Sequence, residues 1–148
     1  RGDWCWVRDP VRGWAAARLV STEADGSRAC RTEAGKTVKV PATQELWHFK
    51  RSELRRLEDD VVMLDHVNEA QIAHTLRARY EQDNIYTWVG ASRTVLISIN
   101  PFKRLPLYTP DVIDEHAHPP PNRLLPPHVF DIAQGAYHDM RMDGGNQA

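Results

Sequence analysis

Alternating apolar and polar positions near the beginning of the chain predict short β-strands. Trp4 and Trp6 are expected on one face of the first strand, with Cys5 and Val7 on the other. Further strands are predicted at residues 14–21, 29–32 and 37–40, with hairpin turns at 25–26 and 33–36. Four short strands at this spacing indicate a small β-barrel.

A second apolar run lies at residues 93–99. Its β-branched, nearly uncharged stretch from Val95 to Ile99 predicts a strand buried on both faces. Asn100-Pro101 ends this strand, because proline cannot donate to a β-ladder. The basic, aromatic loop that follows is either a ligand site at the end of a buried strand or a surface turn with one anchoring Phe.

Two further segments have helical periodicity. Asn68 is expected to cap the first helix, with Gln71 as its capping-box partner. Its buried stripe is predicted at Ile72, Leu76 and Tyr80, beside Ala73, with Arg77 and Arg79 facing outward.

The second helical segment is predicted to begin at Pro126-Pro127 and to end at Gly144-Gly145. Its expected buried face consists of Val129, Ile132, Ala133, Ala136, Tyr137 and Met140. A shorter helix is predicted at residues 111–115. Residues 43–64 mix charges of both signs, which predicts a solvated connector between the two parts of the chain.

Composition narrows the function classes. The 148 residues carry a formal net charge of −1, so no overall field favours nucleic acid or an anionic membrane. An apolar run of about 18 residues is absent from the sequence, so direct membrane insertion is not expected. Cys5 and Cys30 are too few for a disulfide scaffold and are predicted to be small core residues in a reducing compartment. The chain begins with Arg1 rather than Met, from which we expect that it is a fragment.

Two short motifs resemble a phosphate-binding site and a metal site, but the residues around them do not support either assignment. Gly35-Lys36-Thr37 matches the end of a P-loop, but Cys30 stands where the first glycine should be and a strand follows instead of a helix. We interpret it as a hairpin turn. His116 and His118 lie beside acidic residues, but the proline run after them offers no scaffold for a zinc site, so we assign no metal ligands.

The loop after the second apolar run carries a family resemblance. Residues 100–109, N-P-F-K-R-L-P-L-Y-T, resemble the purine-binding loop of the myosin motor domain. Three further segments resemble that family in the same order: N-E-A with L-R-A-R-Y and I-Y-T (68–87), P-P-H-V-F-D-I-A with A-Y (126–137), and D-G-G-N-Q-A (143–148). In myosins the last of these directly precedes the P-loop strand.

The N-terminal pattern W-V-x-D-P, G-W-x-x-A and G-K-T-V-K-V is similar to the SH3-like domain that precedes many myosin motors. The resemblance therefore implies a small SH3-like β-barrel followed by the start of an α/β P-loop-type myosin motor domain. The expected boundaries are 1–48 for the barrel, 49–66 for a linker and 67–148 for the beginning of the motor domain.

The resemblance also implies a function. It implies an actin-activated ATPase that uses ATP with Mg²⁺, acts with actin filaments and light chains through parts outside this chain, and lies in the cytoplasm on the cytoskeleton. In this chain it implies an adenine-binding set, namely Asn100, Pro101, Phe102, Lys103, Arg104 and Tyr108. Asn100 and Tyr108 would bond the base edge, and Pro101 and Phe102 would pack beside the ring. It assigns no catalytic residue and no metal ligand here, and it predicts that the reading frame continues to a P-loop within about ten residues.

Two alternatives from other classes stay open. One is a non-catalytic binding module in which Trp4, Trp6 and Trp14 form an aromatic cage for methylated lysine or a groove for a proline-rich peptide. We favour instead that these rings fill the core of a small barrel. The other is a truncated myosin-like chain without motor activity.

Overall fold

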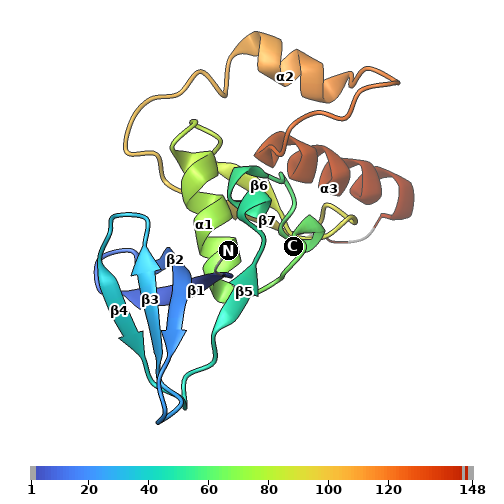
Figure 1. Cartoon of the computed structure of the whole chain (residues 1–148). Coiled ribbons are helices and arrows are strands. Elements are labelled where there is room, and N and C mark those ends of the chain that lie inside the picture. The colour runs from blue at the N-terminus through green and yellow to red at the C-terminus, as the bar shows by residue number, and fades with distance from the viewer. Residues whose placement is uncertain (1–2, 145, 147–148) are drawn as a thin grey trace. The chain divides into compact units, whose positions relative to one another are not determined.

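The computed structural model describes residues 3–144 and 146 (Figure 1). The chain forms two compact units, one of Arg1–Leu57 with Asp65–Thr75 and one of Glu58–Leu64 with Leu76–Ala148. The predicted features at Gly145, Gln147 and Ala148 lie outside the described residues. None of the helices in the described part of the chain is both long enough and apolar enough for a membrane span.

The first unit is built on an antiparallel sheet of five strands in the order β4-β3-β2-β1-β5 (Figure 1). The strands are β1 (Trp4–Asp9), β2 (Gly13–Thr22), β3 (Arg28–Thr32), β4 (Thr37–Val40) and β5 (Trp47–Phe49). The four predicted strands are confirmed. The fifth, β5, pairs with β1 and lies within the segment predicted to be a solvated connector.

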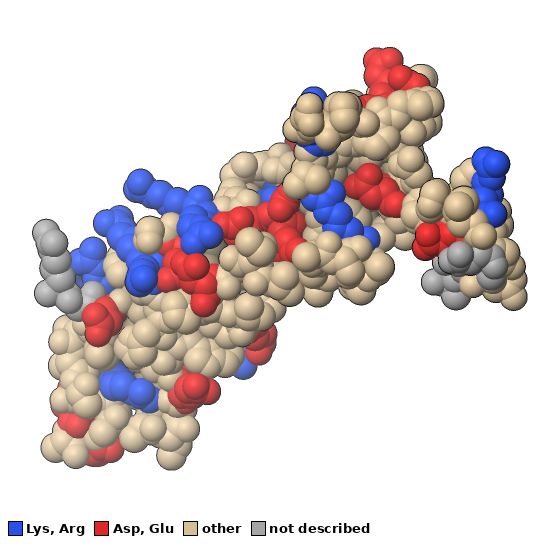
Figure 2. Space-filling model, turned by 90° about the vertical axis from the view of Figure 1, so that its right-hand side faces the viewer, with Lys and Arg blue, Asp and Glu red and all other residues tan. Residues whose placement is uncertain are grey.

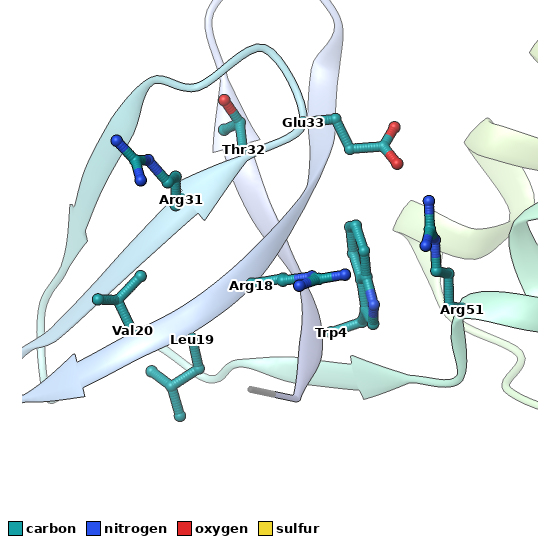
Figure 3. A pocket seen from close by; sticks show the side chains of 8 residues that line it. All are labelled: Trp4, Arg18, Leu19, Val20, Arg31, Thr32, Glu33 and Arg51. Carbon is teal, nitrogen blue, oxygen red and sulfur yellow. The ribbon is translucent and has the colours of Figure 1, made fainter. Parts of the chain in front are cut away.

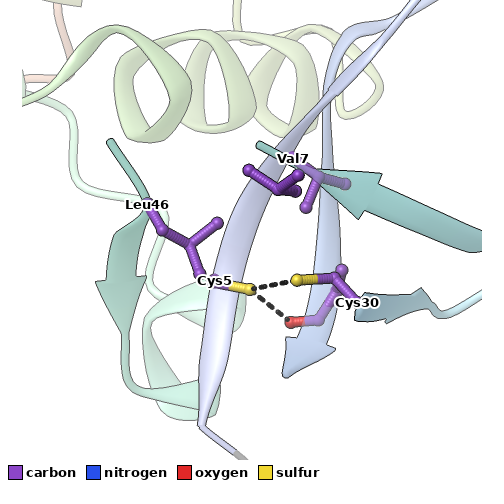
Figure 4. Close-up of a cluster of buried hydrophobic side chains, with 6 residues drawn as sticks. Cys5, Val7, Cys30 and Leu46 are labelled. Carbon is purple, nitrogen blue, oxygen red and sulfur yellow. Dashed lines mark hydrogen bonds between the residues drawn. The ribbon is translucent and has the colours of Figure 1, made fainter. Parts of the chain in front are cut away.

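The two faces of β1 carry different side chains, as the alternation predicts. Cys5 and Val7 are fully buried in a cluster on one face, with Cys30 and Leu46 (Figure 4). The opposite face holds an aromatic cluster of Trp6, Trp14 and Phe49 together with Ala70. Side chains that alternate between the two faces of β1 therefore contribute to both hydrophobic clusters of this unit.

The two cysteines are core residues with free thiols, as predicted. The Cys5 sulfur lies 3.7 Å from the Cys30 sulfur and 3.6 Å from the carbonyl oxygen of Ala17 (Figure 4 shows the cluster). Burial, followed by the neighbouring Cys30, raises the pKa of Cys5 to about 12. A thiol held in this form is a poor nucleophile, so the pair serves packing rather than chemistry.

The segment Gly35-Lys36-Thr37 is a hairpin turn, which confirms the interpretation against a P-loop. Gly35 has a φ of 81°, and the Thr32 amide donates to the Lys36 carbonyl at 2.9 Å. Thr37 begins β4 rather than a helix. No helix N-terminus stands here to hold a phosphate.

The prediction of a solvated connector at residues 43–64 is wrong. Besides β5, the segment forms two 3-10 helices, η1 (Arg51–Arg55) and η2 (Val61–Met63). Its side chains at Leu46, Phe49, Glu53, Asp60, Val61 and Leu64 are buried. The buried carboxylates accept backbone hydrogen bonds, Glu53 from the Lys50 amide at 2.7 Å and Asp60 from the Gly90 amide at 2.8 Å. Charge along the sequence was therefore a poor guide to exposure, because these acids are paired.

Helix α1 (Glu69–Tyr80) begins at the predicted cap. The Asn68 carboxamide oxygen accepts from the Gln71 amide at 2.9 Å. The second half of the predicted capping box is wrong, because the Gln71 side chain is buried and accepts from the Trp6 indole nitrogen at 3.2 Å. A buried indole N–H requires an acceptor, and Gln71 supplies it.

The buried stripe of α1 is also different from the predicted one. Gln71, Thr75 and Arg79 are buried at i, i+4 and i+8, whereas Ile72, Leu76 and Tyr80 are only half-buried. Arg79 does not face outward. It donates from Nε to the Thr87 hydroxyl at 3.0 Å and from Nη2 to the Tyr86 carbonyl at 2.9 Å. Which face of α1 is buried therefore depends on hydrogen-bond partners, and hydrophobic periodicity cannot reveal these.

In the second unit, β6 (Tyr86–Trp88) and β7 (Leu96–Ser98) form a two-stranded antiparallel sheet. The turn between them has positive φ at Gly90 and Arg93. Strand β6 is buried throughout, but β7 is only partly covered and Val95 is 54% exposed. The prediction of a strand buried on both faces is therefore wrong. Within the described residues β7 has a single strand neighbour. Its side chains are therefore more exposed than their apolar composition predicts.

The second unit also contains α2 (Pro110–Ala117) and α3 (Val129–Asp143). Thr109 caps α2, which confirms the short helix and extends it. The predicted start of α3 at Pro126-Pro127 is wrong, because His128 is the cap, with extended backbone and a ring nitrogen that accepts from the Phe130 amide at 3.1 Å. At the other end Gly144 has a φ of 66° and ends the helix as predicted.

The predicted buried face of α3 is wrong as well. Ile132 and Ala136 are half-buried, but Ala133 is exposed and Val129, Tyr137 and Met140 have exposures of 39%, 58% and 46%. Within its unit, α3 meets α2 near its beginning, where Asp131 bonds His116. Along the rest of the helix, the apolar stripe lacks a covering element among the described residues.

Candidate functional site

The candidate site is the loop of residues 100–108, which follows β7 in the second unit. The Asn100 carboxamide oxygen accepts from the Phe102 amide at 2.9 Å and closes a tight turn. Phe102 has a φ of 51°, a conformation that is uncommon for an aromatic residue. Its ring is 88% exposed, so it is not the buried anchor of a surface turn. The turn instead presents an aromatic face to solvent.

The loop is attached to its unit at three points. The Tyr80 hydroxyl donates to the Pro101 carbonyl at 3.1 Å, and Lys103 forms an ion pair with Asp83. Farther along, a ring nitrogen of His128 lies 3.0 Å from the Leu107 carbonyl. The contacts are made by residues of α1, of the turn after it and of the α3 cap. The backbone of the loop is therefore positioned, while several of its side chains stay exposed.

Tyr108 lies at the end of the loop and faces two ways. Its hydroxyl oxygen lies 2.7 Å from that of Tyr86, and its ring packs edge-on against His128 and Phe130 with centroid distances of 5.7 and 6.0 Å. The side chain is nevertheless 53% exposed. A phenol oxygen can donate one hydrogen bond and accept others, so Tyr108 retains capacity for a ligand while Tyr86 holds it in place.

Tyr86 is the buried member of this pair. Burial first, and then the hydrogen bond with Tyr108, raise its pKa to about 12. It therefore stays a protonated, neutral donor across the physiological range. The sequence contains no sign of this pairing, since the two residues are 22 positions apart.

His128 is fixed in one neutral form by its two neighbours. One ring nitrogen, Nδ1, accepts from the Phe130 amide, so the other, Nε2, carries the proton that it donates to the Leu107 carbonyl. Burial, and then the charge of His116, lower its pKa. Sequence reasoning missed this residue as part of the site; its signal was a histidine directly before a helical periodicity, where a cap belongs.

The two histidines at the end of α2, His116 and His118, do not form a metal centre. His116 is 4% exposed, and its Nδ1 donates to the Asp131 carboxylate at 2.7 Å. His118 is exposed and pairs with Asp114 on its own helix. Within residues 3–144 and 146 no cluster of three or more His, Cys, Asp or Glu side chains is arranged to hold a metal ion. The His116 ring instead packs against the tilted His128 ring, with 4.7 Å between the ring centroids, next to the loop.

The predicted site residues differ in how they are placed. Asn100, Phe102, Lys103, Arg104 and Tyr108 are exposed, and Pro101 is half-buried. Lys103 is occupied by its ion pair with Asp83. The arrangement offers two polar groups, Asn100 and Tyr108, and one free aromatic ring, which suits a flat heteroaromatic ligand better than a metal or a phosphate.

The aromatic-cage alternative in the first unit does not fit the structure. Trp6 and Trp14 are 3% and 7% exposed, and Trp6 stacks on Phe49 at 4.6 Å. Their indole nitrogens donate to Gln71 and Glu69. Trp4 alone is half-buried, and arginines flank it. A methylated lysine needs several exposed rings and no competing cation, so this cage is excluded.

Comparisons with known proteins agree on one family. The family described as "Myosin N-terminal SH3-like domain" matches residues 1–44, and "Myosin head (motor domain)" matches residues 58–148. These matches confirm the predicted order of an SH3-like β-domain followed by the start of a motor domain.

Individual relatives give the same result. The chain is 40% identical to the high molecular weight form of myosin-1 from Acanthamoeba castellanii, over 100% of this chain and 9% of that protein. It is 33% identical to myosin-H heavy chain from Dictyostelium discoideum, over 97% of this chain and 8% of that protein. Human unconventional myosin-Va is 32% identical over 97% of this chain and 8% of its own length. The chain therefore spans less than a tenth of each of these three relatives.

Proposed function

Because the chain belongs to the myosin family, we propose that it forms the beginning of an actin-based, ATP-driven motor in which residues 100–108 hold the adenine base. The observation that carries this proposal is a loop fixed at its backbone but open at its side chains. Tyr80 and His128 bond the loop carbonyls, while the Phe102 ring stays 88% exposed.

In this proposal each loop residue has a separate role. Asn100 and Tyr108 provide hydrogen bonds to the polar edge of adenine, and each such bond contributes a net ~0.5–1.5 kcal/mol. Pro101 and Phe102 pack beside the ring. Arg104 and Lys103 line the rim of the loop, although the pairing of Lys103 with Asp83 makes Arg104 the freer cation.

The chemistry of the motor is proposed to lie elsewhere in the protein. The 148 residues contain no G-x-x-x-x-G-K-[ST] sequence, and Gly35-Lys36-Thr37 is a hairpin turn. Phosphate and Mg²⁺ contacts carry most of the affinity for nucleotide in P-loop sites. We therefore expect this chain by itself to bind ATP feebly and not to hydrolyse it. Actin, light chains and a cytoskeletal location are proposed for the whole motor protein.

The test is base recognition, measured separately from phosphate binding. Saturation-transfer NMR on the 148-residue chain detects weak contacts, and it should show stronger transfer to the ring protons of adenosine than of guanosine. Asn100→Ala and Tyr108→Phe should each reduce the transfer to adenosine. Tyr137→Phe is the matched control, because that exposed tyrosine lies on α3 outside the loop.

In the complete motor, the same two substitutions should lower the preference for ATP over GTP while kcat changes little. Leaving a buried polar edge unpaired costs ~1–3 kcal/mol, which is about 5- to 150-fold in relative affinity. A collapse of kcat with an unchanged preference between the two nucleotides would refute the role of the loop in adenine binding.

A further inference from the structure

A transverse row of side chains crosses one face of the sheet in the first unit. The strand register places Trp4 opposite Arg18, Arg18 opposite Arg31, and Arg31 opposite Thr37. On the other side of Trp4 the row continues to Phe49. These residues lie on the face away from the Cys5 cluster, because their neighbours Cys5, Ala17 and Cys30 point into that cluster.

The row forms part of an open groove of about 390 Å³ (Figure 3). Its polar lining comes from Arg18, Arg31, Thr32, Glu33 and Arg51, and its apolar wall from Trp4 with Leu19 and Val20. Figure 3 shows Trp4 flanked by Arg18 and Arg51. Their guanidinium carbons lie 4.9 and 5.4 Å from the centre of the indole ring, within the range of a cation–π contact.

The charge of this groove is not balanced within the chain. The lining contains three arginines, Arg18, Arg31 and Arg51, but a single carboxylate, that of Glu33. None of the ion pairs found among the described residues involves Arg18, Arg31 or Arg51. The face drawn in Figure 2 carries side chains of both signs, and the net charge of the whole chain is −1. The excess of arginine over acidic residues in the groove is therefore not a property of the composition as a whole.

The pairing of Arg18 with Arg31 is unfavourable by itself. Like charges directly opposite each other on adjacent strands destabilise a sheet. In Figure 3 their guanidinium groups turn away from each other, Arg18 toward Trp4 and Arg31 to the opposite side. An anionic ligand would reduce this repulsion, so its binding to the groove would be electrostatically favourable.

We propose that this groove binds an acidic peptide segment of a partner protein in an extended conformation. The planar guanidinium forks match carboxylates in a bidentate geometry. The three arginines are spread along the row rather than directed at one point, because two lie on opposite sides of Trp4 and the third turns away from it. A single phosphate ion could not reach all three, whereas carboxylates on alternate residues of an extended strand repeat every ~7 Å and could.

The apolar wall favours a peptide as well. The indole of Trp4 and the exposed side chain of Val20 offer surface for the aliphatic part of a chain that carries the carboxylates. The arginines repel a methylated lysine, which separates this groove from the aromatic cage considered above. The site lies wholly within the first unit, so it is independent of the adenine-binding loop.

The experiment is a fluorescence polarisation titration of the 148-residue chain with a labelled peptide of the sequence E-S-E-S-E. The uncharged peptide Q-S-Q-S-Q is the control ligand. Arg18→Gln and Arg31→Gln should each weaken binding about threefold to fivefold, because the groups are exposed and screened. Lys36→Gln removes the same charge from the β3–β4 turn outside the groove and should leave the affinity unchanged.

A second substitution separates a binding role from a structural one. Glu33→Gln removes the only acid of the lining and should tighten binding by about threefold, a gain that lost folding cannot produce. The melting temperature of Arg31→Gln should not fall, since the change removes a like-charge pair. Equal affinity for the two peptides, or equal effects of Arg18→Gln and Lys36→Gln, would overturn the proposal.

Two competitors distinguish other anionic ligands. Millimolar inorganic phosphate that displaces the peptide through Arg18 would assign the groove to a simple oxyanion and overturn the peptide role. Binding to phosphatidylserine vesicles that is lost in Arg31→Gln would assign it to a membrane surface instead. The acidic-peptide proposal is supported if neither phosphate nor the vesicles compete with the peptide and if the variants change its affinity as expected.

Discussion

The hydroxyl oxygens of Tyr86 and Tyr108 lie 2.7 Å apart, although one residue is buried and the other is 53% exposed. The pair joins strand β6 to the end of the candidate adenine loop. It gives the exposed tyrosine a fixed position without using all of its hydrogen-bonding capacity. Recognition of a flat base benefits from such positioning, because less side-chain freedom is lost on binding.

The first prediction concerns this pair. Tyr86→Phe should lower the free energy of unfolding by ~0.5–1.5 kcal/mol, because the partner Tyr108 is exposed and can bond water instead. Chemical denaturation followed by circular dichroism measures this change. The matched control Tyr137→Phe should have no effect, since Tyr137 is exposed on α3. A loss as large as ~3 kcal/mol would mean that the other hydrogen-bond partner of the Tyr86 hydroxyl, the Ser98 side chain, also contributes strongly to stability.

The second prediction concerns acid stability. The pKa of His128 is lowered by burial and by the charge of His116, while the hydrogen bond to the Leu107 carbonyl and the charge of Asp131 act in the opposite direction. The folded chain therefore binds a proton less readily than the unfolded chain, and stability that is present above pH 6.5 is lost as the pH falls below it. We expect the urea midpoint of the second unit to decrease between pH 7.5 and 5.5.

The test of this assignment is His128→Asn. Asparagine keeps a side-chain acceptor at the helix cap but does not titrate, so the acid loss should become smaller while α3 stays capped. His138→Asn on the exposed part of α3 is the control and should keep the original pH dependence. If the urea midpoint of the His128 variant decreases with falling pH as much as that of the unchanged chain, another titrating group causes the acid destabilisation.

The third prediction concerns the alkaline side. Burial raises the pKa of Cys5 from 9.0 to about 12, so the folded chain retains a proton that the unfolded chain releases. The resulting stabilisation is fully present below pH 9 and is lost as the pH rises toward about 12. Tryptophan fluorescence reports mainly on this unit, because four of the five tryptophans, Trp4, Trp6, Trp14 and Trp47, belong to it. Cys5→Ala should be less stable at pH 7 but should lose less stability on going to high pH.

The sequence predicted the first unit well because its signals are local. Trp4, Cys5, Trp6 and Val7 alternate between two buried faces, and Gly35 marks a turn that requires positive φ. These signals depend only on neighbouring residues. Strand β5 was missed because three residues are too short to show a period.

The errors share a different physical cause, which is long-range pairing. Gln71, Thr75 and Arg79 are polar but buried in α1, and two of them bond residues on other elements. In α3 the opposite occurs, since Tyr137 and Met140 are apolar in pattern but exposed. Periodicity measures which face is apolar, whereas burial depends on what covers that face.

The candidate site follows the same division. The position of the loop after an apolar strand could be predicted, and so could its aromatic and basic composition. The part played by His128 could not, because it depends on contacts with Leu107 and Phe130 that are set by the fold. Tyr86 was equally hidden. Composition indicated which loop to consider as a candidate site, but not the residues that hold that loop in place.

The last prediction compares the two sheets by hydrogen exchange. Strand β1 is an interior strand, with β2 on one side and β5 on the other, and its Cys5 and Val7 side chains are fully buried. Strand β7 has the single partner β6, and Val95 beside it is 54% exposed. Amides that open only with the whole unit exchange slowest, whereas those in a sheet with little cover exchange through local opening.

We therefore expect amide protection in residues 4–9 to exceed that in residues 96–98, by mass spectrometry or NMR at neutral pH. Strand β4, at the edge of the larger sheet, is the internal control and should be intermediate, because it too has one neighbour but contributes the buried Val40. Equal protection of β1 and β7 would show that the second unit packs as firmly as the first. In that case the partial burial of the β7 side chains would be a poor indicator of the stability of that strand. The apolar composition of residues 95–99 would indicate it better.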